Sequence, residues 1–135
     1  ILRDFAHAPS KVAATVKAGI SLYPNRRLVA AYELHTFSSL NKDFLPQYEG
    51  KLEDADIGIV FYSPHTLEMK KMPAISEEEI RKAFAKEDIL IFTERTQLES
   101  YLLSLNWYES NLLLMSSGTF NGIDFNSFAK QILSK

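Results

Sequence analysis

The sequence contains no cysteine among its 135 residues, which excludes disulfides and thiolate-bound metal ions. It has no apolar run that approaches the roughly 18 residues needed to cross a bilayer, and no segment with the character of a signal peptide. Neither sign of charge predominates, because 15 basic and 17 acidic residues leave a formal net charge of -2. We therefore expect no nucleic-acid partner, no membrane partner and a cytoplasmic location, which the lack of cysteine permits.

What is present is ordinary for a globular protein. Hydrophobic residues make up 46% of the chain and charged residues 24%, which suits one domain with one core. The first residue is Ile1 rather than Met, and Ile1-Leu2 already has the character of a strand. We therefore expect residues 1–135 to be a single domain cut from a longer protein.

Apolar runs of strand length alternate with segments of helical periodicity. The runs expected to be strands are Leu2–Asp4, Leu28–Tyr32, Ile57–Tyr62, Ile89–Phe92 and Leu112–Met115. Helices are expected after Pro9, over Asn41–Asp54, after Ser76, around Leu98–Leu105 and after Asp124. This order predicts a Rossmann-like, three-layer α/β domain with a mainly parallel sheet of five or six strands and helices on both faces. Whether an edge strand runs antiparallel is left open.

In a parallel sheet of this kind, ligands bind beyond the carboxyl ends of the strands. The loops expected at those ends are Asp4–Ser10, Glu33–Ser39, Ser63–Ala74 and Ser116–Asp124. The third is predicted to be an irregular loop of about a dozen residues, a length that is often functional in compact domains.

The first of these loops has the sequence Asp-Phe-Ala-His-Ala-Pro. An acid at a strand end, here Asp4, can accept both hydroxyls of a ribose. His7 comes just before a helix N-terminus, where the positive potential favours anions such as phosphate. The same residues are also compatible with a plainer arrangement in which Asp4 caps the helix and His7 lies in a turn.

The other loops carry further candidates for ligand binding. These are His35 and Ser38 after the second strand, Ser63 and His65 after the third, and Ser116 and Ser117 after the fifth. The loop after the second strand can instead be a polar loop with a helix cap at Ser38 or Ser39, and His65 can simply lie on the surface. The turn after the fifth strand is of a kind that many α/β domains have. Although three histidines fall on strand-end loops, none has the short spacing typical of a metal site, and we expect no metal ion.

The segment at residues 4–9 resembles the Asp-Tyr-Ala-His-x-Pro segment that opens the C-terminal domain of Mur ligases. Residues 33–39 are similar to the Pro-His-Arg-Tyr-Ser-Arg stretch of the alanine-adding branch, with His35 and Ser38 at matching places. Thr36 and Ser39 stand where that branch has arginines.

Two later segments resemble the muropeptide-recycling branch instead. Residues 62–66 are similar to its Pro-x-His loop, and residues 115–123 to its Met-Ser-Asn-Gly-Gly-Phe-x-Gly-Ile segment. The resemblance spans nearly the whole chain, and it implies that residues 1–135 are the C-terminal domain of a longer, multidomain ligase.

By this likeness, Asp4 binds the ribose of ATP and His7 lines the nucleotide and acyl-phosphate site. The residues implied to face the substrate are His35, Ser38, Ser63, His65, Ser116 and Ser117. The sequence has no Gly-x-x-x-x-Gly-Lys-Ser/Thr phosphate loop. The resemblance accordingly implies that a central domain outside this chain binds most of ATP and Mg²⁺, and that the chain's partners are its own central and N-terminal domains.

The implied activity of the parent is an ATP-dependent amide ligase of peptidoglycan biosynthesis or recycling. It would join UDP-N-acetylmuramate to a recycled tripeptide through an acyl phosphate, with L-alanine as the alternative amine substrate, and the isolated domain is expected to be inactive. A rival from another class is a stand-alone flavodoxin-like or receiver-like binding module. A receiver needs clustered acids at its strand ends, whereas Asp4 stands alone.

Overall fold

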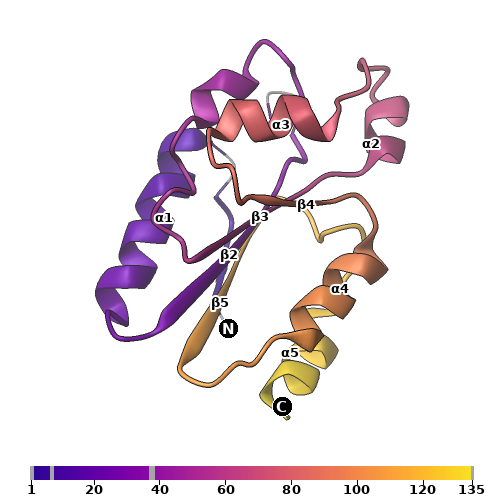
Figure 1. The fold of residues 1–135 in the computed structure, drawn as a ribbon. Helices are drawn as coiled ribbons and strands as arrows, with labels where there is room; N and C mark the ends of the chain where they lie inside the picture. Colours follow the sequence, from indigo (N-terminus) through magenta and orange to yellow (C-terminus); the bar gives the residue numbers. More distant parts are fainter. Residues whose placement is uncertain (1, 7, 37–38, 135) are drawn as a thin grey trace.

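The computed structural model describes residues 2–6, 8–36 and 39–134. In this part of the chain, five strands form one sheet in the order β1-β5-β2-β3-β4, and every pair is parallel (Figure 1). The strands are β1 (Leu2–Asp4), β2 (Arg27–Glu33), β3 (Ile57–Phe61), β4 (Leu90–Phe92) and β5 (Ser110–Met115). The predicted α/β class and the five predicted strands are confirmed.

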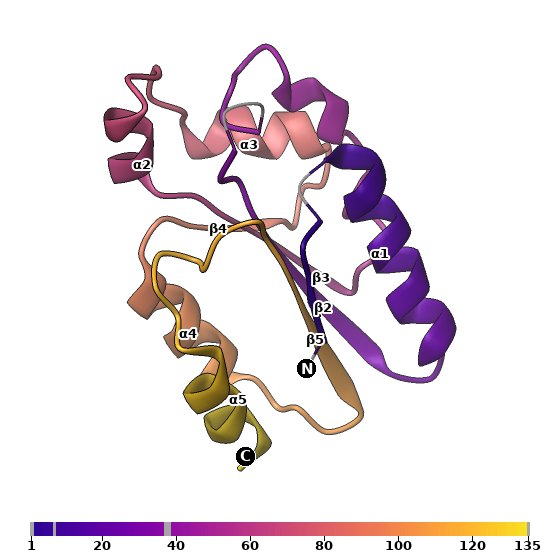
Figure 2. The same cartoon turned by 180° about the vertical axis from the view of Figure 1, so that it is seen from behind.

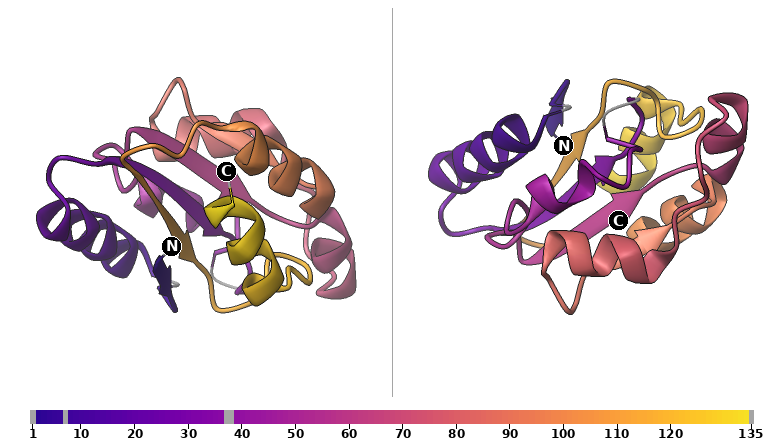
Figure 3. Two further views of the ribbon diagram at one scale, coloured as in Figure 1. Left: turned by 90° about the horizontal axis from the view of Figure 1, so that it is seen from below. Right: turned by 90° about the horizontal axis from the view of Figure 1, so that it is seen from above.

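Helices cover both faces of this sheet. They are α1 (Pro9–Leu22), the 3-10 helix η1 (Leu45–Tyr48), α2 (Pro64–Met69), α3 (Glu77–Phe84), α4 (Arg95–Ser104) and α5 (Phe125–Leu133). α1, η1 and α3 pack on one face, and α4 with α5 on the other, so that the sheet is the middle of three layers (Figures 1 and 3). The view from behind shows β1 at the sheet edge beside β5 (Figure 2).

β2 is buried along nearly its whole length because successive side chains point into different layers. Tyr32 and Ala30 belong to the hydrophobic cluster that includes Val16 of α1 and Phe84 of α3. Ala31, with its side chain on the other face, belongs to the cluster under α4 and α5. Side chains at odd-numbered positions of β2 therefore point toward the α4–α5 layer. Glu33, the last residue of β2, occupies one of these positions.

The helix predicted over Asn41–Asp54 is wrong, because only Leu45–Tyr48 is helical, as the 3-10 turn η1. The Asn41 side chain instead accepts a hydrogen bond from the backbone N–H of Asp43 at 2.8 Å, a local turn that competes with a helix. Pro46 removes one helical donor, and Gly50 has a φ of +74°, which ends regular structure beyond η1.

The irregular loop predicted over Ser63–Ala74 is also wrong, since it contains α2. Pro64 occupies the first turn of α2, and the Ser63 hydroxyl caps it by accepting a hydrogen bond from Thr66 N at 3.3 Å. Lys71, with a φ of 57°, leaves the helical region just after α2. The start of α3 is as predicted: Ser76 and Glu79 form a capping box.

None of the helices in the described part of the chain combines the length and apolar character that crossing a membrane requires.

Candidate functional site

The carboxyl ends of the strands meet at one edge of the sheet. Met115 at the end of β5 pairs in register with Asp4 on one side and with Tyr32 on the other. Phe61 at the end of β3 pairs with Glu33 and with Phe92. The four loops singled out from the sequence therefore leave the sheet along the same edge.

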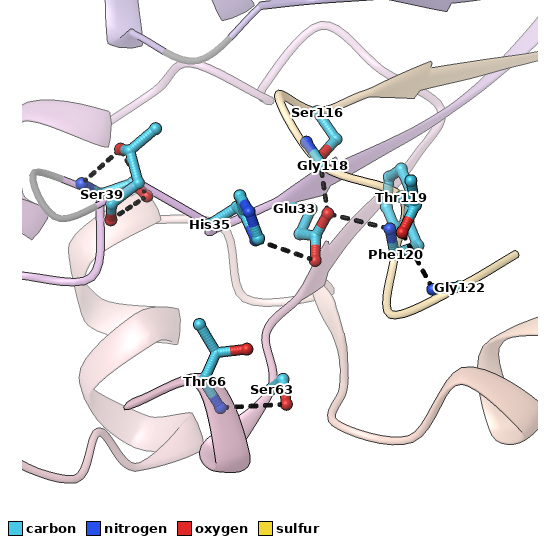
Figure 4. A network of polar contacts seen from close by, with 11 residues as sticks. Glu33, His35, Ser39, Ser63, Thr66, Ser116, Gly118, Thr119, Phe120 and Gly122 are labelled. Carbon is cyan, nitrogen blue, oxygen red and sulfur yellow. Dashed lines mark hydrogen bonds and ion pairs between the residues drawn. The ribbon is translucent and has the colours of Figure 1, made fainter. Parts of the chain in front are cut away.

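A buried carboxylate organises the centre of this edge. Glu33, the last residue of β2, is 4% exposed. Its Oε1 accepts a hydrogen bond from the Ser116 hydroxyl at 2.5 Å and from the backbone N–H of Phe120 at 2.9 Å (Figure 4). Both donors point at the same oxygen, which has two lone pairs with which to accept them. Glu33 therefore ties the loop after β5 to the end of β2.

Glu33 was missed as a site residue from the sequence. The signal that could have revealed it was an acid placed directly after the apolar run Leu28–Tyr32, with no polar residue between them. A charged residue that continues a buried strand must find partners, because an unpaired buried charge is strongly destabilising.

The second carboxylate oxygen of Glu33 faces an imidazole. His35 Nδ1 lies 3.7 Å from Glu33 Oε2, and the His35 side chain is 41% exposed (Figure 4). Gly118 lies against both Glu33 and His35, since a Cβ built on it would lie 3.0 Å from Glu33 Oε1 and from two atoms of the His35 ring. Its backbone N–H donates to the Ser116 hydroxyl at 2.7 Å. The structure thus brings together His35 and Ser116, two candidates from different loops, through Glu33.

The turn after β5 is held by a buried aromatic ring. Phe120 is 1% exposed and packs against Phe61 and Phe125, with ring centroids 5.8 and 6.4 Å away. Phe120 and Asn121 have φ values of 53° and 61°, which L-residues rarely adopt. Packing of the ring offsets this backbone strain and fixes the position from which Phe120 N donates to Glu33.

Asp4 lies exposed at the end of β1, and its Oδ1 accepts a hydrogen bond from Ala6 N at 2.8 Å. The N-cap of α1 is Ala8, which makes no side-chain hydrogen bond, so Asp4 does not cap the helix. Asp4 lines a cavity of about 130 Å³ together with Ser116 and Gly118. That volume is below the roughly 300 Å³ at which enclosed ligand pockets begin. The cavity formed by the described residues is therefore small for a ligand pocket.

The remaining candidates are placed as follows. The Ser63 hydroxyl is buried and is used in capping α2, and His65 lies exposed on α2. Ser117 Oγ is buried without a hydrogen-bond partner among residues 2–6, 8–36 and 39–134. His7 and Ser38 lie outside the described residues. In the same described ranges, no group of three or more acidic or histidine side chains is arranged to hold a metal ion.

Tyrosine hydroxyls near this edge have structural partners. Burial raises the pKa of Tyr62, whose hydroxyl donates to the Ile75 carbonyl at 2.7 Å. Burial likewise raises the pKa of Tyr32 and of Tyr48, whose hydroxyl oxygens lie 2.7 Å apart. These phenols stay neutral and serve as hydrogen-bond partners in the core.

Solved structures of known proteins share this fold, although no family model matches the chain. A murein peptide ligase from Psychrobacter arcticus is similar over 96% of this chain and 26% of its own, with a TM-score of 0.64 and 20% identity. The UDP-N-acetylmuramate–alanine ligase MurC of Thermotoga maritima is similar over 96% of this chain and 25% of its own, with a TM-score of 0.61 and 14% identity.

A third structure is a domain from a Haemophilus ducreyi protein described as a UDP-N-acetylmuramate:L-alanyl-gamma-D-glutamyl-meso-diaminopimelate ligase. It is similar over 98% of this chain and 86% of its own, with a TM-score of 0.57 and 20% identity. The chain thus has the fold of a domain found in Mur ligases, and it spans about a quarter of the length of the two longer ligases.

Proposed function

We propose that this chain is the C-terminal domain of a Mur-type, ATP-dependent amide ligase. The observation that carries the proposal is the cluster of Glu33, His35, Ser116 and Gly118 beside Asp4, at the carboxyl-end edge of a sheet whose fold occurs in Mur ligases. The parent enzyme would join UDP-N-acetylmuramate to an amine-bearing peptide, with ATP supplying the phosphoryl group that activates the carboxylate.

Within this function, Asp4 is the ligand for the ribose of ATP. It is exposed at the end of β1, its Oδ1 holds the loop through Ala6 N, and the ribose would be bound through Oδ2. The sequence contains no phosphate loop, and the described residues form no Mg²⁺ site. The phosphates and the metal ion are therefore assigned to a central domain, and the isolated chain is expected to be inactive.

The amine substrate is proposed to be a recycled tripeptide. In the loop after β2, Thr36 and Ser39 bond to each other, with their hydroxyl oxygens 3.0 Å apart, at the places where the alanine-adding branch has arginines. Neither side chain is a cation, so this pair offers no bidentate clamp for the carboxylate of a free amino acid. L-alanine is the alternative substrate.

The amine preference of the full-length ligase tests this assignment. We expect kcat/KM for L-alanyl-γ-D-glutamyl-meso-diaminopimelate to exceed that for L-alanine by about 100-fold or more, since a site that lacks a clamp must draw binding energy from a longer substrate. Amide product would be followed by mass spectrometry and phosphate release by a coupled assay, with UDP-N-acetylmuramate and ATP held constant. If L-alanine were used equally well or better, the chain would be assigned to the alanine-adding branch instead.

Asp4→Asn should raise the KM for ATP by roughly 10-fold in the full-length ligase, because a hydrogen bond to a charged group contributes about 1.5–3 kcal/mol. Asparagine keeps an oxygen for Ala6 N, so the loop and the melting temperature should be preserved. Asp54→Asn, on an exposed turn, is the matched control and should leave the ATP KM unaltered. An unchanged KM in Asp4→Asn would remove Asp4 from the nucleotide site.

A further inference from the structure

We propose that Glu33 is a positioning residue that holds His35 in the tautomer with the proton on Nδ1, so that Nε2 is free to accept a hydrogen bond from the amino group of the substrate. This inference rests on the proposed function only for the identity of the substrate. The relation between Glu33 and His35 concerns this chain alone.

The two carboxylate oxygens of Glu33 have different partners. Oε1 is occupied by the Ser116 hydroxyl and the Phe120 N–H. Oε2 faces His35 Nδ1 at 3.7 Å. A carboxylate only accepts hydrogen bonds, so the imidazole nitrogen that faces it is favoured in its protonated form. A separation of 3.7 Å is longer than a hydrogen bond, as is common before a ligand has closed a site.

The surroundings leave the imidazole little freedom on its inner side. Gly118 lies against the His35 ring so closely that even a methyl group there would come within 3.0 Å of Cγ and Nδ1. The carboxylate that faces Nδ1 is buried, whereas the His35 side chain is 41% exposed. The geometry thus places Nδ1 of the ring against the protein and leaves the outer part of the ring exposed.

A neutral imidazole with its proton on Nδ1 carries a lone pair on Nε2. In a ligase, this nitrogen would take one proton from the substrate ammonium, and the imidazolium would face the negative charge of Glu33. The freed amine lone pair then attacks the acyl carbon, phosphate leaves with the bonding electron pair, and the remaining excess amine proton leaves with phosphate. In this step Glu33 contacts neither the amine nor the acyl phosphate, and it acts only through His35.

Glu33→Gln separates this role from a purely structural one. The glutamine Oε1 can still accept from Ser116 and Phe120, so the turn after β5 is retained. Its amide nitrogen, however, presents a donor to His35 Nδ1 where the carboxylate presented an acceptor. The preferred tautomer of His35 should therefore switch to the one with the proton on Nε2.

The tautomer can be read directly by long-range ¹H–¹⁵N correlation spectra of the ¹⁵N-labelled 135-residue chain, in buffer alkaline enough for imidazoles to be neutral. His35→Gln identifies the His35 signals, and His65, exposed on α2, is the internal control. We expect the wild-type His35 to carry its proton mainly on Nδ1, the Glu33→Gln chain mainly on Nε2, and His65 to be the same in both. A wild-type His35 protonated mainly on Nε2 overturns the proposal, whether or not the variant folds.

In the full-length ligase, Glu33→Gln should lower kcat/KM for the amine by about 100-fold, the usual contribution of one acid–base group, while the KM for ATP stays unchanged. Equal losses in amine and ATP parameters would indicate a structural role and refute the positioning role. If no amine is ligated by the wild-type protein, the proposed function fails, and the tautomer measurement still decides the role of Glu33.

Discussion

Replacing Phe120 with alanine is expected to lower the free energy of unfolding by about 3–5 kcal/mol, the range for removing a buried aromatic ring. The ring is 1% exposed and contacts aromatic rings of β3 and α5. It also offsets the strain of a residue with a φ of 53°. Chemical denaturation of the chain, followed by circular dichroism, measures the loss.

The same change should loosen the site, because Phe120 N is one of the two donors to Glu33 Oε1. Tyr108→Ala is the control, since its ring is 79% exposed and its loss should alter the free energy of unfolding by no more than about 0.5 kcal/mol. A Phe120→Ala chain that is as stable as the Tyr108→Ala chain would show that the ring does not anchor the turn.

The sheet and most helices could be predicted because their signals are local. Apolar runs bounded by polar residues give the strands, and Ser76 with Glu79 is a start signal that needs no tertiary contact. The helix predicted over Asn41–Asp54 was wrong because local turns compete with a helix there. The turn at Asn41 and the positive φ of Gly50 prevail over an apolar pattern that is typical of a helix.

The site was only partly predictable, for a different reason. A parallel sheet brings loops that are distant in sequence to one edge, and the sequence order alone was enough to predict that edge. It could not predict which residues meet there. Glu33 and Ser116 are 83 positions apart, and their hydrogen bond depends on the register between β2 and β5. The candidate serines also differ in ways that composition does not reveal, because Ser63 caps a helix while Ser116 holds a carboxylate.

Gly118→Ala is expected to lower the free energy of unfolding by about 1–3 kcal/mol, the usual effect of overpacking. Gly118 does not need a positive φ, and what requires glycine there is space. The added methyl group would lie 3.0 Å from Glu33 Oε1, which two donors hold in place, and from the His35 ring. His35, the more exposed neighbour, should therefore turn away from Glu33, and its tautomer preference should weaken.

Gly19→Ala provides the matched control with the opposite sign. Its added methyl group would lie 3.7 Å from the Leu28 side chain, an ordinary contact, and the residue is within α1. Alanine there should raise the free energy of unfolding by about 0.5–1 kcal/mol and leave the His35 spectrum unchanged. If Gly118→Ala also stabilises the chain and preserves the wild-type His35 signals, the close contact among Gly118, Glu33 and His35 is absent in solution. The positioning role of Glu33 would then lack the packing that confines the imidazole.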